Sequence, residues 1–160
     1  MMTMRILFVC LGNICRSPAA EGVFQHLLTE AGLNDRFALD SAGTGAWHEG
    51  QPADRRMRQA AERRGIELTS IARQVTAGDF ERFDLILAMD ASNLQDLRAL
   101  APTAHRPKIR LFRELDPDAP GEDVPDPYYG HADGFDEVLD IVTRTGQAWL
   151  DELRDADHFT

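Results

Sequence analysis

The chain has 160 residues, of which 28% are charged, and its formal net charge at pH 7 is −10. Residues 1–80 hold nine basic and nine acidic side chains, whereas residues 81–160 hold eight basic and eighteen acidic ones. An acidic surface disfavours nucleic acids and anionic membranes as partners, because both bind basic faces.

A chain of this length can form one domain that buries roughly two-thirds of its unfolded surface without a metal or a disulfide. No repeat, linker or low-complexity run divides it, so we expect a single domain over residues 1–160. The first apolar run is far shorter than the ~20 residues of a membrane span, and no small-residue cleavage site follows it. The two cysteines, Cys10 and Cys15, fit a reducing compartment. We therefore expect the protein to be cytoplasmic.

Apolar runs alternate with amphipathic segments along the chain. Hydrophobic spacing predicts strands at residues 5–9, 36–41, 84–89 and 108–112, and helices at residues 18–31, 54–64, 91–101 and 134–153. We expect Ser17 to cap the first helix and Asp90 the third. This alternation implies an α/β fold, with an open, mostly parallel four-stranded sheet and helices on both faces. Residues 113–133 show no periodic pattern, and a connection of that length is usually functional.

The segment at residues 9–18 reads V-C-L-G-N-I-C-R-S-P and joins the first predicted strand to the first predicted helix. Its loop opens with Cys10 and closes with Arg16, so the amides between them can surround a small tetrahedral anion. A thiol attacks phosphorus only as the thiolate, which the helix N-terminus and the Arg16 guanidinium would stabilise. The planar guanidinium can also hold two phosphate oxygens at once. These features predict a phosphate cradle with Cys10 as the nucleophile at its floor.

The other residues of the loop suit the same role. Gly12 lets the backbone bend without placing a side chain in the cavity, while Asn13 and Ser17 can brace the loop or donate to the sulfur. The loop lacks the lysine of an ATP-binding P-loop. Cys10 and Cys15 do not suggest zinc, because no second pair of ligands follows at a suitable spacing. We expect neither a metal nor a cofactor.

The run V-C-L-G-N-I-C-R-S-P-A-A-E from residue 9, together with D-P-Y-Y-G at residues 126–130, resembles the low-molecular-weight protein tyrosine phosphatase family. The resemblance covers essentially the whole chain, including S-A-G-T at residues 41–44, A-R-Q at residues 72–74 and M-D-A-S-N-L at residues 89–94. It implies the strand order 2-1-3-4 with the cradle after strand 1, where the winding of the sheet reverses. In one departure, Ser70 stands where many relatives carry a histidine.

Expulsion of an aryloxide from phosphorus requires a proton donor at the leaving oxygen. The aperiodic segment supplies six candidates, which are Asp116, Asp118, Glu122, Asp123, Asp126 and Asp133. Asp126 is the expected general acid, because prolines on both sides fix its backbone, tyrosines follow it, and it matches the family motif.

The resemblance also implies a substrate site. The cradle residues that would bind the phosphate are Leu11, Gly12, Asn13, Ile14, Cys15 and Ser17. Ser41 would belong to the hydrogen-bond network that braces the loop. Trp47, Tyr128 and Tyr129 would form the walls of a deep cleft that a phosphotyrosine ring could fill. The alternative for these aromatic residues is ordinary packing, but the position of Trp47 among glycines in a loop favours the cleft.

These assignments predict hydrolysis of protein phosphotyrosine and aryl phosphates through a phosphocysteine at Cys10, with inorganic phosphate as product. Protein arginine phosphatases are one alternative, although relatives with that preference carry threonine in place of Ile14. Arsenate reductases on this scaffold need further cysteines, and a phosphate-binding module would lack the nucleophile, the arginine or the acid. A further hypothesis is that oxidation joins Cys10 to Cys15 in a reversible disulfide, provided that their Cα atoms lie within ~7 Å.

Overall fold

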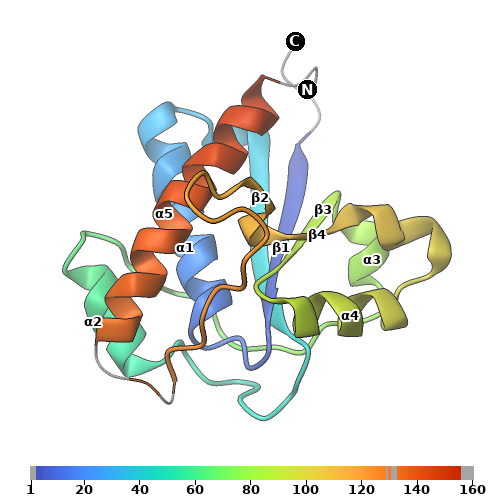
Figure 1. Cartoon of the computed structure of the whole chain (residues 1–160), viewed down its shortest axis with the longest axis horizontal. Coiled ribbons are helices and arrows are strands. Elements are labelled where there is room, and N and C mark those ends of the chain that lie inside the picture. Colours follow the sequence, from blue (N-terminus) through green and yellow to red (C-terminus); the bar gives the residue numbers. More distant parts are fainter. Residues whose placement is uncertain (1–2, 129, 131–132, 156–160) are drawn as a thin grey trace.

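The computed structural model describes residues 3–128, 130 and 133–155 (Figure 1). Within them, the strands are β1 (Met4–Cys10), β2 (Phe37–Gly43), β3 (Leu85–Ala88) and β4 (Ile109–Leu111). The α-helices are α1 (Arg16–Ala31), α2 (Arg55–Glu62), α3 (Asp79–Arg82), α4 (Ala91–Leu100) and α5 (Asp133–Arg154). Short 3₁₀ turns cover Asn34–Arg36, Thr103–Lys108 and Phe112–Leu115. Every predicted strand and helix is present, while α3 and the 3₁₀ turns are additional.

The strands form one parallel sheet in the order β2-β1-β3-β4, which confirms the expected order. Cys10 at the end of β1 pairs with Gly43 at the end of β2, and Val9 pairs with Ala88 at the end of β3. The C-terminal ends of these three strands therefore lie level at one edge of the sheet. The chain leaves β1 and β3 for helices on opposite faces, so a crevice is expected between the two loops.

The sheet is buried on both faces. From β1, Ile6 and Phe8 join the hydrophobic layer of α1, α2 and α5, whereas Leu7 and Val9 join that of α3 and α4. Figure 1 shows α1 and α5 on one side of the sheet and α4 on the other. Coverage on both faces explains why residues 6–10 of β1 are continuously apolar and do not alternate.

Helix α5 completes the larger of the two hydrophobic layers. Its buried stripe includes Phe135, Val138, Leu139, Val142, Trp149, Leu150 and Leu153. The indole Nε1 of Trp149 donates to the carbonyl of Phe112 at 2.7 Å, so the polar atom of this fully buried side chain is satisfied. Truncation of such an aromatic side chain to alanine costs about 3–5 kcal/mol.

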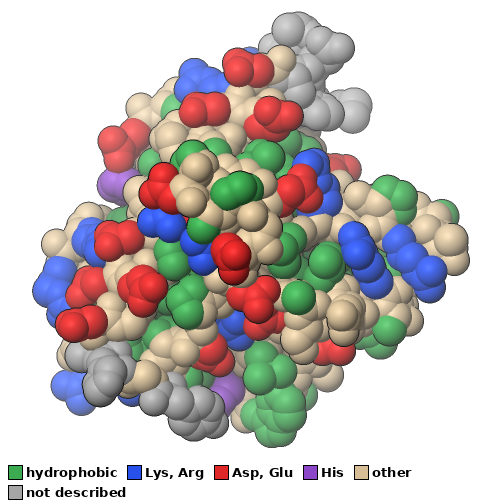
Figure 2. All heavy atoms as spheres, viewed as in Figure 1, with side chains coloured by type: hydrophobic (Ala, Val, Ile, Leu, Met, Phe, Trp, Pro, Cys, Tyr) green, Lys and Arg blue, Asp and Glu red, His purple; other side chains and the backbone are tan. Residues whose placement is uncertain are grey.

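The surface is acidic, as the net charge of −10 requires. Figure 2 shows acidic side chains spread over the face that carries α5 and the connection before it. Some of them pair with basic side chains, as Asp136 and Asp140 do with Arg64 of the α2–α3 connection. Among the described residues, no helix is both long and apolar enough to cross a membrane.

Two helix starts are capped by aspartate. Asp54 accepts from the amide of Arg56 at 2.8 Å, and Asp90 accepts from the amide of Asn93 at 2.7 Å, as predicted for Asp90. The cap predicted at Ser17 is wrong, because α1 begins one residue before it and Ser17 is already helical. The physical reason is that the Ser17 hydroxyl is engaged elsewhere, beside the sulfur at the end of β1.

Candidate active site

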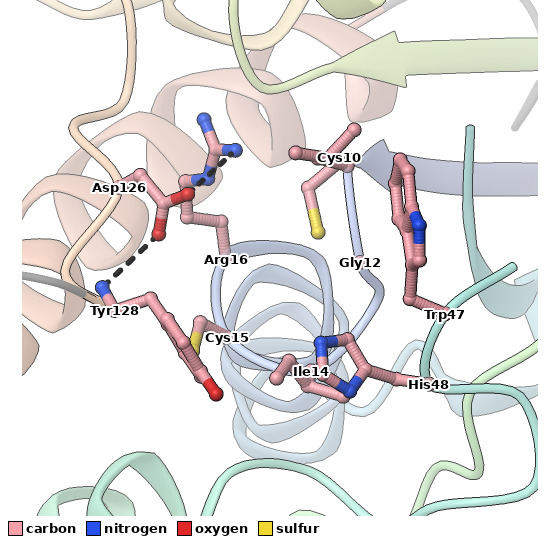
Figure 3. Close-up of a pocket in the computed structure, with 10 residues that line it drawn as sticks. Cys10, Gly12, Ile14, Cys15, Arg16, Trp47, His48, Asp126 and Tyr128 are labelled. Carbon is pink, nitrogen blue, oxygen red and sulfur yellow. Dashed lines mark hydrogen bonds and ion pairs between the residues drawn. The ribbon is translucent and has the colours of Figure 1, made fainter. Parts of the chain in front are cut away.

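Cys10 ends β1 and lies at the floor of the loop formed by residues 11–15 (Figure 3). Only 3% of its surface is exposed. The backbone N–H of Asn13 donates to the Sγ atom of Cys10 at 3.2 Å, and the hydroxyl of Ser17 lies 3.0 Å from the same sulfur. Because Ser17 Oγ accepts from Nδ2 of Asn13 at 2.8 Å, its own hydrogen is free to donate to the sulfur. Both donors favour a negative charge on Cys10.

Asn13 holds the loop in its turn. Among the described residues other than glycine, it alone has a positive φ, 56°, which asparagine tolerates better than most residues. Its Oδ1 accepts from the backbone N–H of Arg73 at 3.1 Å. The Arg73 guanidinium is fixed in turn by Asp40 and by the fully buried carboxylate of Asp79. Through Arg73, hydrogen bonds therefore connect the middle of β2 and the start of α3 to the turn beside Cys10.

The bracing role expected of Ser41 stays a prediction. Its side chain is buried, but its Oγ makes no hydrogen bond to the loop, nor does the hydroxyl of Ser70 have a partner in the described part of the chain. Burial raises the pKa of the Glu21 carboxyl beside Ser41. The backbone N–H of Arg73 donates to the side chain of Asn13 and so braces it. This N–H is present whichever side chain stands at position 70.

Most amides of the loop have no hydrogen-bond partner among the described residues. Apart from the amide of Asn13, they donate no hydrogen bond within the described residues; these are the amides of Leu11, Gly12, Ile14 and Cys15. Unpaired N–H groups are costly where the chain is buried, as it is at Ile14 and Cys15. A run of unpaired amides followed by a helix N-terminus forms a binding site for anions. The loop is thus suited to hold the oxygens of a phosphate group.

Arg16, the first residue of α1, is 4% exposed and is oriented by two other segments. Its Nη1 donates to Oδ2 of Asp90 at 2.6 Å and to the carbonyl of Val124 at 3.1 Å, while its Nη2 lies 3.6 Å from Oδ2 of Asp126. Burial alone lowers the pKa of Arg16, but the charges of Cys10 and Asp90 outweigh it and raise this pKa above its ordinary value. The guanidinium is therefore a permanent cation at the edge of the cradle.

Asp126 belongs to the long connection between β4 and α5, which is docked against the edge of the sheet. The amide of Val124 donates to the carbonyl of Met89 at 2.8 Å, and Oδ1 of Asp123 accepts from the first amide of α4 at 2.9 Å. Asp126 itself accepts from the amide of Tyr128 at 3.1 Å (Figure 3). Its side chain is 40% exposed, so a bound substrate can reach the carboxyl.

The start of the same connection is anchored by Asp116. Its fully buried carboxylate lies 2.8 Å from Nε of Arg113 and 2.9 Å from Nε of Arg144 on α5. Burial alone raises the pKa of Asp116, but Arg144, the amide of Asp118 and Arg113 lower it to about 2. The segment predicted to lack structure is thus fixed by ion pairs between distant parts of the chain, which a local pattern does not reveal.

A cavity of about 400 Å³ opens above Cys10 (Figure 3). Its lining residues are Cys10, Leu11, Gly12, Ile14, Cys15, Arg16, Trp47, His48, Asp126 and Tyr128. Most of the predicted site residues are therefore brought together around one space. Asn13, Ser17 and Ser41 do not line it, and Tyr129 lies outside the described residues.

The walls of the cavity carry aromatic rings. Trp47 is 72% exposed, so it does not pack in the core, and its ring lies so close to Gly45 that an added Cβ would come within 1.9 Å of the indole. On the other wall, the ring centroid of Tyr128 lies 6.1 Å from that of His48, and the guanidinium carbon of Arg56 lies 5.4 Å from the centroid of the Tyr128 ring. With a volume of about 400 Å³, the cavity between these rings is within the size range of small-molecule binding sites.

Cys15 also lines the cavity, but as a neutral thiol. Burial, followed by the charge of Asp54, raises the pKa of Cys15. Cys10 and Cys15 are both free thiols, and a reversible disulfide between them stays a prediction. In the part of the chain that the structure describes, no three histidine, cysteine, aspartate or glutamate side chains gather as a metal site would require.

Three contributors to the site were not among the predicted site residues. Asp90, expected only as a helix cap, also orients Arg16, and its place directly after β3 at the ligand-binding edge of the sheet is the signal for that role. His48 packs against Gly12, where an added Cβ would lie 3.0 Å from the imidazole. The hydrogen bond from Arg73 to Asn13 spans 60 positions, so no local signal marks it.

Comparisons with known proteins agree with this geometry. A family model described as "Low molecular weight phosphotyrosine protein phosphatase" matches residues 5–158. The chain is 48% identical over 157 residues to a low molecular weight protein-tyrosine-phosphatase of Streptomyces coelicolor, with 96% of each chain covered. It is 41% identical over 152 residues to the human low molecular weight phosphotyrosine protein phosphatase, with 94% of this chain and 96% of the human one covered.

A solved structure gives the same result. The crystal structure of a protein tyrosine phosphatase from Entamoeba histolytica, with Hepes in its active site, superposes with a TM-score of 0.93 at 42% identity, covering 96% of this chain and 98% of that one. The chain therefore belongs to the low-molecular-weight protein tyrosine phosphatase family.

Proposed function

We propose that the protein hydrolyses phosphotyrosine in proteins, with Cys10 as the nucleophile, Arg16 as the phosphate-binding cation and Asp126 as the general acid. The observation that carries the proposal is the grouping of these side chains around loop amides that lack partners in the described chain. The sulfur is at the floor, the guanidinium at the edge, and the Asp126 carboxyl 3.6 Å from that guanidinium at the mouth. The substrate is thus a phosphoprotein, and the product is inorganic phosphate.

In the first step, the loop amides and Arg16 bind the non-bridging oxygens of the substrate phosphate. The Cys10 thiolate attacks phosphorus in line with the phenolic oxygen, so that an S–P bond forms as the P–O bond breaks. Asp126 gives its proton to the leaving oxygen, and a neutral tyrosine side chain departs. Because the amides and the guanidinium are already in position, they stabilise charge on the equatorial oxygens without reorganisation.

In the second step, water attacks the phosphocysteine. Asp126, now a carboxylate, takes a proton from the water, the P–S bond breaks, and phosphate leaves. The Asn13 amide and the Ser17 hydroxyl stabilise the sulfur as it regains its negative charge. The same donors therefore assist the nucleophile in the first step and the leaving group in the second.

The form of the cavity favours tyrosine as the substrate side chain. Trp47 and Tyr128 stand above the loop, and a phenyl ring between them would make favourable aromatic contacts. Phosphoserine carries no ring, so its peptide backbone would meet these walls before the phosphate reached the loop. Ile14 lines the cavity with an apolar side chain, which offers no hydrogen-bond acceptor to the guanidinium of phosphoarginine.

A reducing location suits this chemistry, since Cys10 reacts only as a thiolate. Both cysteines are free thiols in the structure, and a reducing cytoplasm would keep them so. The cytoplasm is therefore the proposed site of action.

The test is turnover of one peptide sequence that carries phosphotyrosine, phosphoserine or phosphoarginine. Wild type should have its highest kcat/KM for phosphotyrosine, and Cys10→Ser should abolish turnover. Asp126→Asn should slow phenyl phosphate more than p-nitrophenyl phosphate, because the nitrophenolate leaves without a proton. Glu122→Gln is the matched control, since it neutralises an exposed carboxyl of the same connection and should retain activity.

Mass spectrometry of acid-quenched reactions identifies the intermediate. Asp126→Asn should accumulate phosphate on Cys10 with p-nitrophenyl phosphate, because its second step lacks a base. Turnover that persists in Cys10→Ser, phosphate on a different residue, or a preference for phosphoarginine would each contradict the proposed function.

A further inference from the structure

A second groove lies beside the catalytic cavity, with a volume of about 340 Å³. Its lining residues are Leu11, Thr44, Gly45, Trp47, Asp96, Ala99 and Leu100. We name it the α4 groove, because its last three residues belong to α4. Leu11 and Trp47 line both hollows, so these two side chains form a boundary between the α4 groove and the space above Cys10.

Exposed apolar side chains concentrate in the α4 groove. The large hydrophobic side chains with the greatest exposure among the described residues are Leu11 at 42%, Trp47 at 72%, Ile71 at 55% and Leu100 at 61%. Three of these four line the groove. Figure 2 shows exposed hydrophobic side chains at the lower edge of the molecule, with acidic side chains above them. A concentration of this kind next to a binding cavity indicates a contact surface for a partner.

The groove is held in place relative to Cys10. The amide of Thr44 donates to the carbonyl of Cys10, and the amide of Gly45 donates to the carbonyl of Leu11, both at 2.9 Å. The segment that carries Trp47 is thereby fastened to the cradle loop. Because Gly45 has no side chain, the indole lies directly against its backbone. The boundary between the two hollows is therefore built before any substrate arrives.

We propose that the α4 groove binds an apolar side chain of the substrate polypeptide, close in sequence to the phosphotyrosine that occupies the catalytic cavity. This inference rests on the proposed function. The inference is supported by the continuity of the groove with the cavity. An extended peptide advances about 3.3 Å per residue, so a peptide bound in the cavity can pass over Trp47 and place a side chain a few positions away in the groove. The groove is mostly apolar, so leucine, isoleucine, methionine or phenylalanine would bury surface there.

Charge narrows the class of substrate further. The ionisable side chain that lines the α4 groove is the exposed Asp96, and the protein as a whole carries a net charge of −10. An acidic residue in the groove would be repelled, whereas neutral or basic neighbours of the apolar residue would not. The preferred substrate is thus a phosphotyrosine segment that has an apolar residue nearby and lacks acidic residues at that point.

The experiment uses phosphotyrosine peptides with a background of serine and lysine. A single leucine is moved through the three positions on either side of the phosphotyrosine, and kcat/KM is measured for each peptide. At one position leucine should raise kcat/KM about tenfold over serine, because most of its side chain leaves water. Aspartate at the same position should lower kcat/KM. The small substrate p-nitrophenyl phosphate does not reach the groove and reports the chemistry alone.

Leu100→Asp should abolish the leucine preference and leave turnover of p-nitrophenyl phosphate unchanged, because Leu100 does not line the catalytic cavity. Ile71→Asp is the matched control: it changes a similarly exposed residue outside the groove and should keep the preference. Sedimentation velocity over a range of concentrations accompanies the kinetics. The wild type should not form dimers through the groove.

Equal kcat/KM for leucine and serine at all six positions would overturn the inference, as would a preference that survives in Leu100→Asp. Dimers of the wild type that Leu100→Asp dissociates would also overturn it, since the groove would then hold a second copy of the chain. Failure of the proposed function would give a different kinetic result. It would appear as missing turnover of every phosphotyrosine peptide, whatever its neighbouring residues.

Discussion

Nη1 of Arg16 lies 2.6 Å from Oδ2 of Asp90, while Oδ1 of the same carboxylate caps α4 by accepting from the amide of Asn93 at 2.7 Å. One side chain thus joins the starts of two helices that cover opposite faces of the sheet. Only 4% of the Arg16 side chain and 19% of the Asp90 side chain are exposed, so the pair is largely removed from water. Loss of one partner from such a pair leaves an uncompensated charge.

Asp90→Ala should lower the free energy of unfolding by about 3–5 kcal/mol. The substitution removes the carboxylate that pairs with the buried Arg16 guanidinium, and it removes the cap of α4. Asp90→Asn keeps the cap and should cost less. In the alanine variant, kcat/KM for p-nitrophenyl phosphate should fall about 100-fold, since the guanidinium is no longer held in position. Urea unfolding with and without inorganic phosphate should show a larger stabilisation by phosphate in the variant, because the anion replaces the missing charge.

Asp54→Ala is the control for this prediction. It removes the cap of α2 but no partner of Arg16, so it should cost about 1 kcal/mol and show the wild-type response to phosphate. Equal destabilisation by Asp54→Ala and Asp90→Ala would mean that the contact with Arg16 contributes nothing beyond the cap.

Ser17→Ala should lower kcat about 10- to 100-fold, because a hydrogen bond to a charged group contributes about 1.5–3 kcal/mol. Alkylation of Cys10 by iodoacetate at neutral pH should slow in parallel, since the sulfur loses one donor. Ser41→Ala provides the comparison, because the buried Ser41 hydroxyl makes no hydrogen bond to the loop in the described structure. It should stay within about twofold of wild type. A loss as large as that of Ser17→Ala would support the bracing role that the family resemblance implies for Ser41.

Ser17 also illustrates where the sequence is informative. Its position before an amphipathic segment correctly indicates the start of α1, because burial of one helix face imposes a period that the sequence displays. The same holds for β1, whose continuous apolar run reflects a strand covered on both faces. The predicted cradle between Cys10 and Arg16 follows from residue chemistry at a fixed spacing. Each of these features is determined by residues close together in the chain.

The rest of the site depends on contacts between distant segments. Arg16 meets Asp90 across 74 positions and the Val124 carbonyl across 108. A local pattern reports which face of an element is buried, but it cannot tell which of many carboxylates will meet a given arginine. The prediction that Ser17 caps α1 is wrong for a related reason. The Ser17 hydroxyl contacts the sulfur of Cys10, whose position is set by β1. The prediction that Asp126 is the general acid rests on its family motif and its two prolines, not on periodicity.

Asp116 should make the protein more sensitive to acid. Its pKa lies at about 2 in the folded protein, below the ordinary value of 3.8, so the folded state binds this proton less tightly than the unfolded state does. The stabilisation is therefore complete above pH 4 and is lost as the pH falls through about 2. Asp116→Asn should lower the free energy of unfolding by about 2 kcal/mol at neutral pH. The difference from wild type should shrink between pH 4 and pH 2.

Urea unfolding at a series of pH values measures this effect. Asp118→Asn serves as the control, because its carboxyl is 68% exposed and lies 3.4 Å from Arg144, a surface pair of small value. It should change stability by less than about 0.5 kcal/mol at any pH. A difference between Asp116→Asn and wild type that stays constant down to pH 2 would rule out the ion pairs as its source.

Gly45→Ala should displace the indole of Trp47, because the new Cβ would lie 1.9 Å from the present position of the ring. The catalytic cavity would then lose one wall, and we expect kcat/KM for phosphotyrosine peptides to fall about tenfold, mainly through KM, since aromatic contacts bind the substrate ring. Turnover of p-nitrophenyl phosphate at saturation should change little, because Cys10, Arg16 and Asp126 are not moved. The leucine preference proposed for the α4 groove should disappear.

Tryptophan fluorescence reports the displacement directly. The chain has two tryptophans, and Trp149 is fully buried, so quenching by acrylamide monitors Trp47. Gly45→Ala should alter this quenching, whereas Gly78→Ala, whose added Cβ would meet no atom closer than 3.8 Å, should not. If quenching changes while the kinetics with peptides stay the same, the Trp47 ring does not form a wall of the substrate site. If both change together, the wall and the boundary of the α4 groove are the same side chain.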